Sequence, residues 1–253
     1  FNDTATTEIY TLSLHDALPI STRRPAAPEP SPRVRRPEAC ETRCVNGHRY
    51  LAAHARVVAL VEPLDDDLAI PATPGWSLLD LLAHLAGAAT DLAAHDVDDW
   101  SLDEWTAAQV AARRGRDRAT ILGEWATAAA GAAAVVDDPA AFDLDEAFAR
   151  MPIIDTTGHE GDILEAIGRP ATIDPLDWAV IAPHREAMLG LLVAESGVAP
   201  LRVRTPEGDD WLLGGAVPAT TVTMPRNELW RSLMGRRTRA AVAAYDWSGD
   251  PDA

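Results

Sequence analysis

The chain has 253 residues, with 39 acidic and 22 basic side chains and a net charge of −17. The first 44 residues hold six charges of each sign, so all the excess negative charge falls on the remainder. Such a field disfavours nucleic acid and anionic membrane surfaces as partners. No apolar run approaches the length needed to cross a bilayer, so we predict a cytoplasmic monomer or small homo-oligomer without nucleic-acid or membrane partners.

The first 44 residues are predicted to be a non-native or disordered tail. Within residues 1–21, the peptide TLSLHDALPI resembles translated sequencing-adapter DNA and lacks the charged start and apolar centre of a signal peptide. Residues 22–44 are rich in Pro, Arg and Ala and show no periodic apolar face, which indicates a disordered tail or translated upstream DNA. Cys40 and Cys44 lie here, and without a second Cys or His pair nearby their spacing is a weak metal or disulfide signal.

The remaining residues contain no cysteine. This excludes a catalytic thiol, a cysteine-ligated zinc and a disulfide from that part of the chain, so a metal there must sit on histidines and carboxylates. Any thiol chemistry therefore needs a thiol supplied from outside.

Residues 45–195 are predicted to form a helical bundle. Helices are expected at 48–61, 77–95, 102–113, 119–136 and 151–167. A proline-rich loop covers 62–75, and Ser77 caps the helix that follows it. Pro152 suits the first turn of a helix that Gly168 ends.

The pattern changes in the C-terminal part, residues 196–253. A helix within 175–195, continuous or restarting at Pro183, leads to Gly197. Short strands are then expected at 200–205, 211–213 and 220–223, followed by a helix over 228–245. The predicted fold is therefore mainly α, a helical bundle with a small α+β appendage.

Two histidines in the predicted bundle suggest a metal site. Asp155 precedes His159 by four residues, so the two side chains share one helical face, about 40° apart around the axis. Joined by His84 from another helix, they would make a three-ligand site with room for water or substrate. In the alternative interpretation, His84 is an ordinary histidine at the core edge and Asp155 a helix cap. The spacing alone leaves both open.

Three segments carry a family resemblance. They are Pro-Gly-Trp to His-Leu-Ala-Gly at 74–87, His-Glu-Gly-Asp-Ile to Gly-Arg-Pro at 159–170, and Glu-Leu-Trp-Arg to Gly-Arg-Arg at 228–237, before a final Asp-Trp-Ser-Gly-Asp. Together they span about residues 46–250. In this order they resemble the mycothiol-dependent maleylpyruvate isomerase family, a branch of the DinB-like four-helix metalloproteins with a sterol-carrier-like C-terminal domain.

The resemblance implies a divalent metal, with zinc as the expected ion, on His84, Asp155 and His159. The family commonly has Glu where this chain has Asp155, and the shorter arm implies a metal that is displaced, more weakly held or bound through water. Asp162, one turn beyond His159, is either an acceptor for an imidazole N–H or a solvent-facing charge.

The resemblance also implies that an arginine of the C-terminal domain grips a substrate carboxylate. Arg236 and Arg237 are the nearest matches, and the sequence does not say which of the two faces the site. The alternative is an amphipathic helix with both arginines in solvent.

The function implied is activation of a low-molecular-weight thiol, mycothiol, as a metal-bound thiolate. The thiolate would add to maleylpyruvate and leave after rotation, or stay attached to another electrophile, so isomerase and S-transferase chemistry both remain open. One alternative is a metal-assisted hydrolase using the same ligands. Another is a non-catalytic binding module with a weakened site, which Asp155 favours.

Overall fold

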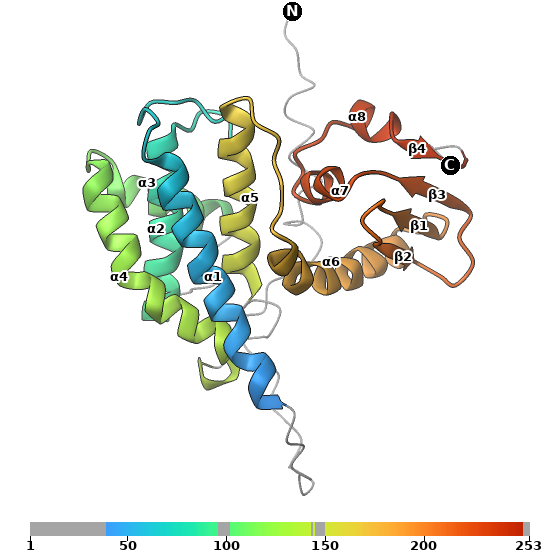
Figure 1. The fold of residues 1–253 in the computed structure, drawn as a ribbon, viewed down its shortest axis with the longest axis horizontal. Coiled ribbons are helices and arrows are strands. Elements are labelled where there is room, and N and C mark those ends of the chain that lie inside the picture. The colour runs from blue at the N-terminus through green and yellow to red at the C-terminus, as the bar shows by residue number, and fades with distance from the viewer. Residues whose placement is uncertain (1–38, 96–101, 143, 145–149, 250–253) are drawn as a thin grey trace, which may run out of the picture. The chain divides into compact units, whose positions relative to one another are not determined.

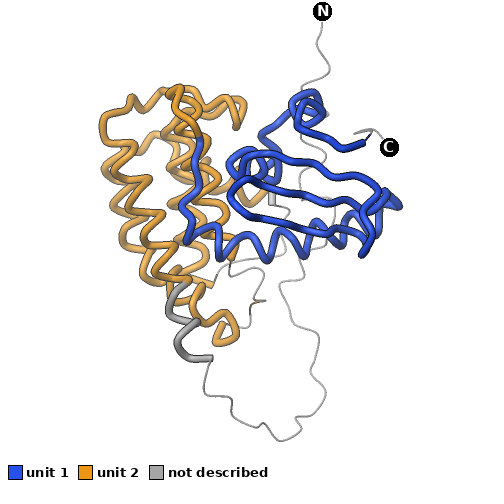
Figure 2. Tube along the Cα trace, turned by 45° about the vertical axis from the view of Figure 1, so that its right-hand side comes forward, with its two compact units in different colours: residues 1–19, 171–253 blue, residues 20–170 orange. Residues whose placement is uncertain are grey.

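The computed structural model describes residues 39–95, 102–142, 144 and 150–249. The chain divides into two compact units, one comprising residues 20–170 and the other containing everything from Ala171 onward (Figure 2). Residues 1–38, most of the predicted tail, lie outside the described residues, and that prediction stays untested.

The first unit is a helical bundle (Figure 1). Its long helices are α1 (Ala39–Val61), α2 (Leu78–Ala94), α4 (Arg118–Asp137) and α5 (Met151–Ala166), and the shorter α3 (Leu102–Arg113) packs beside α2. A 3-10 turn, η2 (Pro139–Phe142), follows α4. Helix α2 contacts α3, α4 and α5, while α1 packs against α4 and α5. The mainly helical fold with a four-helix core is as predicted.

Helix α1 begins earlier than the sequence indicated. It starts at Ala39 rather than at residue 48, so residues 39–44, with Cys40 and Cys44, are helical. Close packing against α4 supports this end of the helix. The backbone N–H of Gly47 donates to Asp137 at 2.8 Å, and a Cβ at Gly47 would lie only 2.5 Å from the carbonyl oxygen of Ala133. Once the helix is held at Gly47, adding residues at its N-terminal end costs little free energy, because each added residue gains one hydrogen bond.

By length and composition alone, helix α4 could cross a membrane. The sequence analysis had expected no apolar run of that length. Within the described residues it is a core helix of the bundle. Ile121 and Trp125 are fully buried, and the Trp125 indole donates to the hydroxyl of Tyr50 on α1 at 3.0 Å. Its apolar composition fits a helix packed between α1 and α2.

The second unit begins with α6 (Pro175–Ser196), which the sequence assigned to the bundle. Helix α6 groups with the C-terminal sheet because it packs on strand β2 (Asp210–Leu213). The Trp178 ring of α6 stacks on Trp211 of β2, with centroids 5.8 Å apart. The helix continues through Pro183 without a restart and ends at Gly197, which has a left-handed φ of 72°.

The small sheet has the strand order β2-β1-β3-β4. The three predicted strands appear as β1 (Leu201–Arg204), β2 (Asp210–Leu213) and β3 (Thr220–Thr223). Strand β1 pairs antiparallel with β2 and parallel with β3. Strand β4 (Asp246–Trp247), which was not predicted, pairs antiparallel with β3.

The predicted helix over 228–245 is instead two helices. They are α7 (Arg226–Leu233) and α8 (Arg239–Ala243). Gly235 lies between them with a φ of 69°, a left-handed conformation that ends a helix and that glycine adopts at little cost.

Candidate metal centre

Helix α2 fixes the position of His84. The Ser77 side chain accepts from the backbone N–H of Asp80, and the Asp80 carboxylate accepts from the backbone N–H of Ser77. This reciprocal cap sets where the helix starts and therefore which face His84 takes. Buried leucines surround His84 on α2, and the residue itself is only 5% exposed.

Helix α5 supplies the other two residues. Asp155 lies between the imidazoles, with Oδ2 at 3.1 Å from His84 Nε2 and Oδ1 at 3.4 Å from His159 Nε2. The two imidazole rings meet edge to face, 5.3 Å apart. The structure thus brings His84, Asp155 and His159 together, with one possible ligand atom from each lying within 4.8 Å of the others.

These distances fit a small divalent ion. Two ligand atoms bound at about 2.05 Å to a tetrahedral zinc lie about 3.3 Å apart. The two measured separations from Asp155 to the imidazoles bracket this value. The His84 and His159 side chains are 6% and 7% exposed, but that of Asp155 is 28% exposed. Access to the cluster therefore runs past the carboxylate, where a further ligand could enter.

Each imidazole is held by a hydrogen bond at Nδ1, the ring nitrogen that faces away from Asp155. His159 Nδ1 lies 2.9 Å from Oδ2 of Asp162, which is fully buried, and His84 Nδ1 lies 2.7 Å from Oε1 of Gln109. Both partners accept, so each Nδ1 carries its proton and each Nε2 faces Asp155. The structure thus places Asp162 against the imidazole N–H rather than in solvent. Its role in orienting a metal ligand stays a prediction.

The charges of the cluster shift its pKa values. Burial by itself would lower the pKa of His159, but the charge of Asp155 and hydrogen bonds to Asp155 and Asp162 outweigh it and raise that pKa to about 9. Burial would likewise raise the pKa of Asp155, but the charges of the two imidazoles hold it well below its usual range. Without metal, a proton therefore takes the place that a cation would occupy beside Asp155.

Trp76 walls the cluster on one side. Its ring is stacked on His159 at 6.3 Å and tilted toward His84 at 5.5 Å. The loop before α2 holds it, since the Trp76 N–H donates to Thr73 and its carbonyl accepts from Ile70. Trp76 also lines a cavity of about 310 Å³ along α3. The other lining residues are Asp103, Thr106, Ala107, Val110 and Arg114.

Arg236 and Arg237 both lie in the C-terminal unit, after α7. Arg237 makes a two-pronged contact with Glu228, from Nε at 2.6 Å and Nη2 at 2.9 Å. This hydrogen bond from Arg237 is the main reason that the pKa of Glu228 is lowered. Arg236 donates from Nη1 to the carbonyl of Met234 at 3.1 Å. The Arg237 guanidinium is thus engaged by a carboxylate of its own unit, and the role of either arginine toward a substrate stays a prediction.

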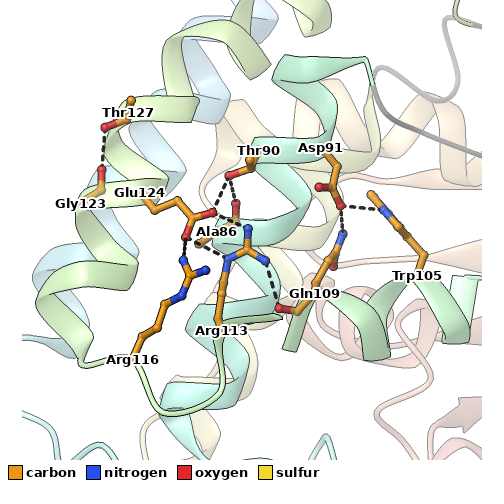
Figure 3. Close-up of polar contacts among 10 residues, drawn as sticks. All are labelled: Ala86, Thr90, Asp91, Trp105, Gln109, Arg113, Arg116, Gly123, Glu124 and Thr127. Carbon is orange, nitrogen blue, oxygen red and sulfur yellow. Dashed lines mark hydrogen bonds and ion pairs between the residues drawn. The ribbon is translucent and has the colours of Figure 1, made fainter. Parts of the chain in front are cut away.

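Sequence reasoning missed Gln109 and its partners on α2 and α3. Gln109 donates from Nε2 to Asp91 at 3.0 Å, and the Trp105 indole donates to the same carboxylate oxygen at 2.8 Å (Figure 3). Gln109 lies in an Ala-rich stretch that was predicted to be helical. The sequence did not indicate which face of that helix packs against α2. Gly87 on α2 was a weak sequence signal of close helix packing at this point. In the structure a Cβ at Gly87 would lie 2.6 Å from the Gln109 side chain.

Comparison with solved structures gives a match in fold. The chain is similar to a crystal structure of a histidine-to-alanine mutant of the mycothiol-dependent maleylpyruvate isomerase, with a TM-score of 0.52 and 13% identity. The match covers 82% of this chain and 92% of the other. No protein-family model and no curated protein matches the sequence. The comparison therefore establishes a shared fold and leaves the reaction to be argued from the site.

Proposed function

We propose that this protein is a zinc-dependent enzyme that activates a low-molecular-weight thiol, such as mycothiol, for attack on an electrophilic substrate. The observation that carries the proposal is the contact of two buried imidazole Nε2 atoms with one partly exposed carboxylate, in a bundle whose fold a mycothiol-dependent isomerase shares. Two imidazoles and one carboxylate suit a catalytic zinc, which keeps a coordination position open.

His84, Asp155 and His159 would hold the ion. When bound, it would lower the pKa of a coordinating thiol until the sulfur is a thiolate. The protein's own groups set the conditions for that chemistry. Asp162 and Gln109 accept from the two Nδ1 atoms, so Nε2 of each ring is the nitrogen left for the ion once its proton is displaced. Trp76 shields the imidazoles from water on the side where it packs.

Residues 45–253, which include all three candidate ligands, contain no cysteine. The nucleophile in this proposal is therefore a second small molecule. Maleylpyruvate-type cis-trans isomerisation and S-transfer to an electrophile both begin with the same thiolate, and the proposal covers both. A cytoplasmic location, where small thiols are kept reduced, belongs to it.

The test is turnover by the zinc-loaded full chain against a panel of electrophiles that includes maleylpyruvate, with and without mycothiol. We expect product only when thiol is present, and more with mycothiol than with glutathione. Asp155→Ala, which removes the shared carboxylate, serves as the inactive control. Turnover that is independent of thiol would refute the proposal and favour metal-assisted hydrolysis.

A further inference from the structure

The two histidines of the cluster are held by chemically different partners. His159 Nδ1 faces a carboxylate, Asp162, on its own helix. His84 Nδ1 faces the neutral side-chain amide of Gln109 on α3. A carboxylate can only accept, but an amide presents an oxygen on one side and an NH2 group on the other. Gln109 orients His84 usefully only if its oxygen is the atom that faces the ring.

Trp105 settles which way the amide points. An indole N–H can only donate, so the Asp91 oxygen that Trp105 contacts at 2.8 Å must be an acceptor. The same oxygen lies 3.0 Å from the Gln109 side chain, which must then present its NH2 group. The amide oxygen is left facing His84 Nδ1 at 2.7 Å, so this ring nitrogen carries a proton, and Nε2, 3.1 Å from Asp155, is the nitrogen left for a metal.

Gln109 and His84 have little freedom to rearrange, because both are buried. Gln109 is 3% exposed and His84 5% exposed. Arg113 joins α3 to α4 by pairing with Glu124, which also accepts from Thr90 of α2 at 3.2 Å (Figure 3). A reversed amide would set NH2 against an N–H on one side and leave Asp91 without its second donor, at the cost of two buried hydrogen bonds.

We infer that Trp105, Asp91 and Gln109 form a directional hydrogen-bond relay that fixes the proton of His84 on Nδ1 and so presents Nε2 as a metal ligand. These three are positioning residues that act through His84. The inference rests on the metal site of the proposed function and adds the device that prepares one of its ligands. His84 is contacted directly by the neutral amide of Gln109, and the carboxylate of Asp91 lies behind that amide. His159 is instead contacted directly by the carboxylate of Asp162.

The test is zinc affinity, measured by competition with a chromophoric chelator on the full chain. Gln109→Met keeps the size of the side chain and removes the acceptor, and it should weaken zinc binding about 10- to 100-fold. Asp91→Leu should weaken it by less, because Gln109 remains but either amide orientation becomes accessible. Asp91→Asn should bind zinc like the wild type, because its amide oxygen can accept from Trp105 and Gln109 together.

Glu124→Gln is the matched control, since it loosens the contact with Arg113 without touching the relay. We expect it to lower the unfolding midpoint and leave zinc affinity unchanged. Wild-type affinity in a folded Gln109→Met, or equal losses in Asp91→Asn and Asp91→Leu, would overturn the relay alone. An equal loss in Glu124→Gln would also overturn it, because attachment of α3 would then explain the effect. A wild type that binds no zinc would instead overturn the proposed function, and the relay with it.

Discussion

The raised pKa of His159 predicts that the stabilisation given by zinc grows as the pH rises. In the unfolded chain the imidazole has its usual pKa of 6.5, and in the folded, metal-free protein the pKa is about 9. Between these values the folded state holds a proton that the unfolded state has lost. The stability that His159 contributes is therefore fully present below pH 6.5 and is lost as the pH approaches 9.

Zinc removes this pH dependence, because a bound ion takes the place of the proton. At a fixed, saturating free zinc concentration, the contribution of His159 should be flat from pH 6.5 to 9. The gap in unfolding free energy between zinc-loaded and metal-free protein should widen by about 1.4 kcal/mol per pH unit, or about 3 kcal/mol over the window. The lowered pKa of Asp155 acts outside this window, since its contribution is lost only as the pH falls below about 3.8.

The measurement is urea unfolding at several pH values, in chelator and in a zinc buffer. Asp162→Asn, which removes one of the carboxylates that raise the pKa of His159, should lower the pH at which the gap stops widening. Glu160→Gln is the matched control on the same helix, because Glu160 pairs with Arg56. It should leave the gap as in the wild type. A gap that stays constant from pH 6.5 to 9 would refute the reasoning.

Three further predictions concern single features of the bundle. Asp155→Glu, which restores the residue common in the resembling family, should bind zinc at least as tightly as the wild type in a chelator competition. Tyr50→Phe leaves the buried Trp125 N–H without its acceptor and should cost about 1–3 kcal/mol in urea unfolding, with zinc binding unchanged. Deleting residues 1–38, whose sequence has no periodic apolar face, should move the melting temperature by less than a few degrees. A larger fall would show that this segment packs on the domain.

Much of the helical architecture could be predicted because local signals were strong. The start of α2 followed from Ser77 and the start of α5 from Pro152, and prolines bounded the loop between α1 and α2. The early start of α1 could not be predicted, because it depends on contact with α4 around Gly47. The split between α7 and α8 turns on the left-handed conformation of Gly235, a single residue inside an otherwise helical pattern.

The candidate site could be predicted only where its members share a helix. Asp155 and His159 lie one turn apart, and that spacing is visible in the sequence. The meeting of His84 with this pair, and of Gln109 with His84, depends on how α2, α3 and α5 pack. Periodicity does not report the relative rotation of separate helices. The resemblance to a known family suggested His84, but nothing of that kind suggested Gln109 or Asp91.

Metal stoichiometry of the purified full chain is the decisive measurement for a metal centre at this position. The wild type, loaded with zinc and passed through a desalting column, should retain one zinc ion per chain by elemental analysis. His84→Ala and His159→Ala should each retain far less while keeping the helical circular dichroism of the wild type. A full complement of zinc in both variants would place the metal elsewhere and contradict the proposed site.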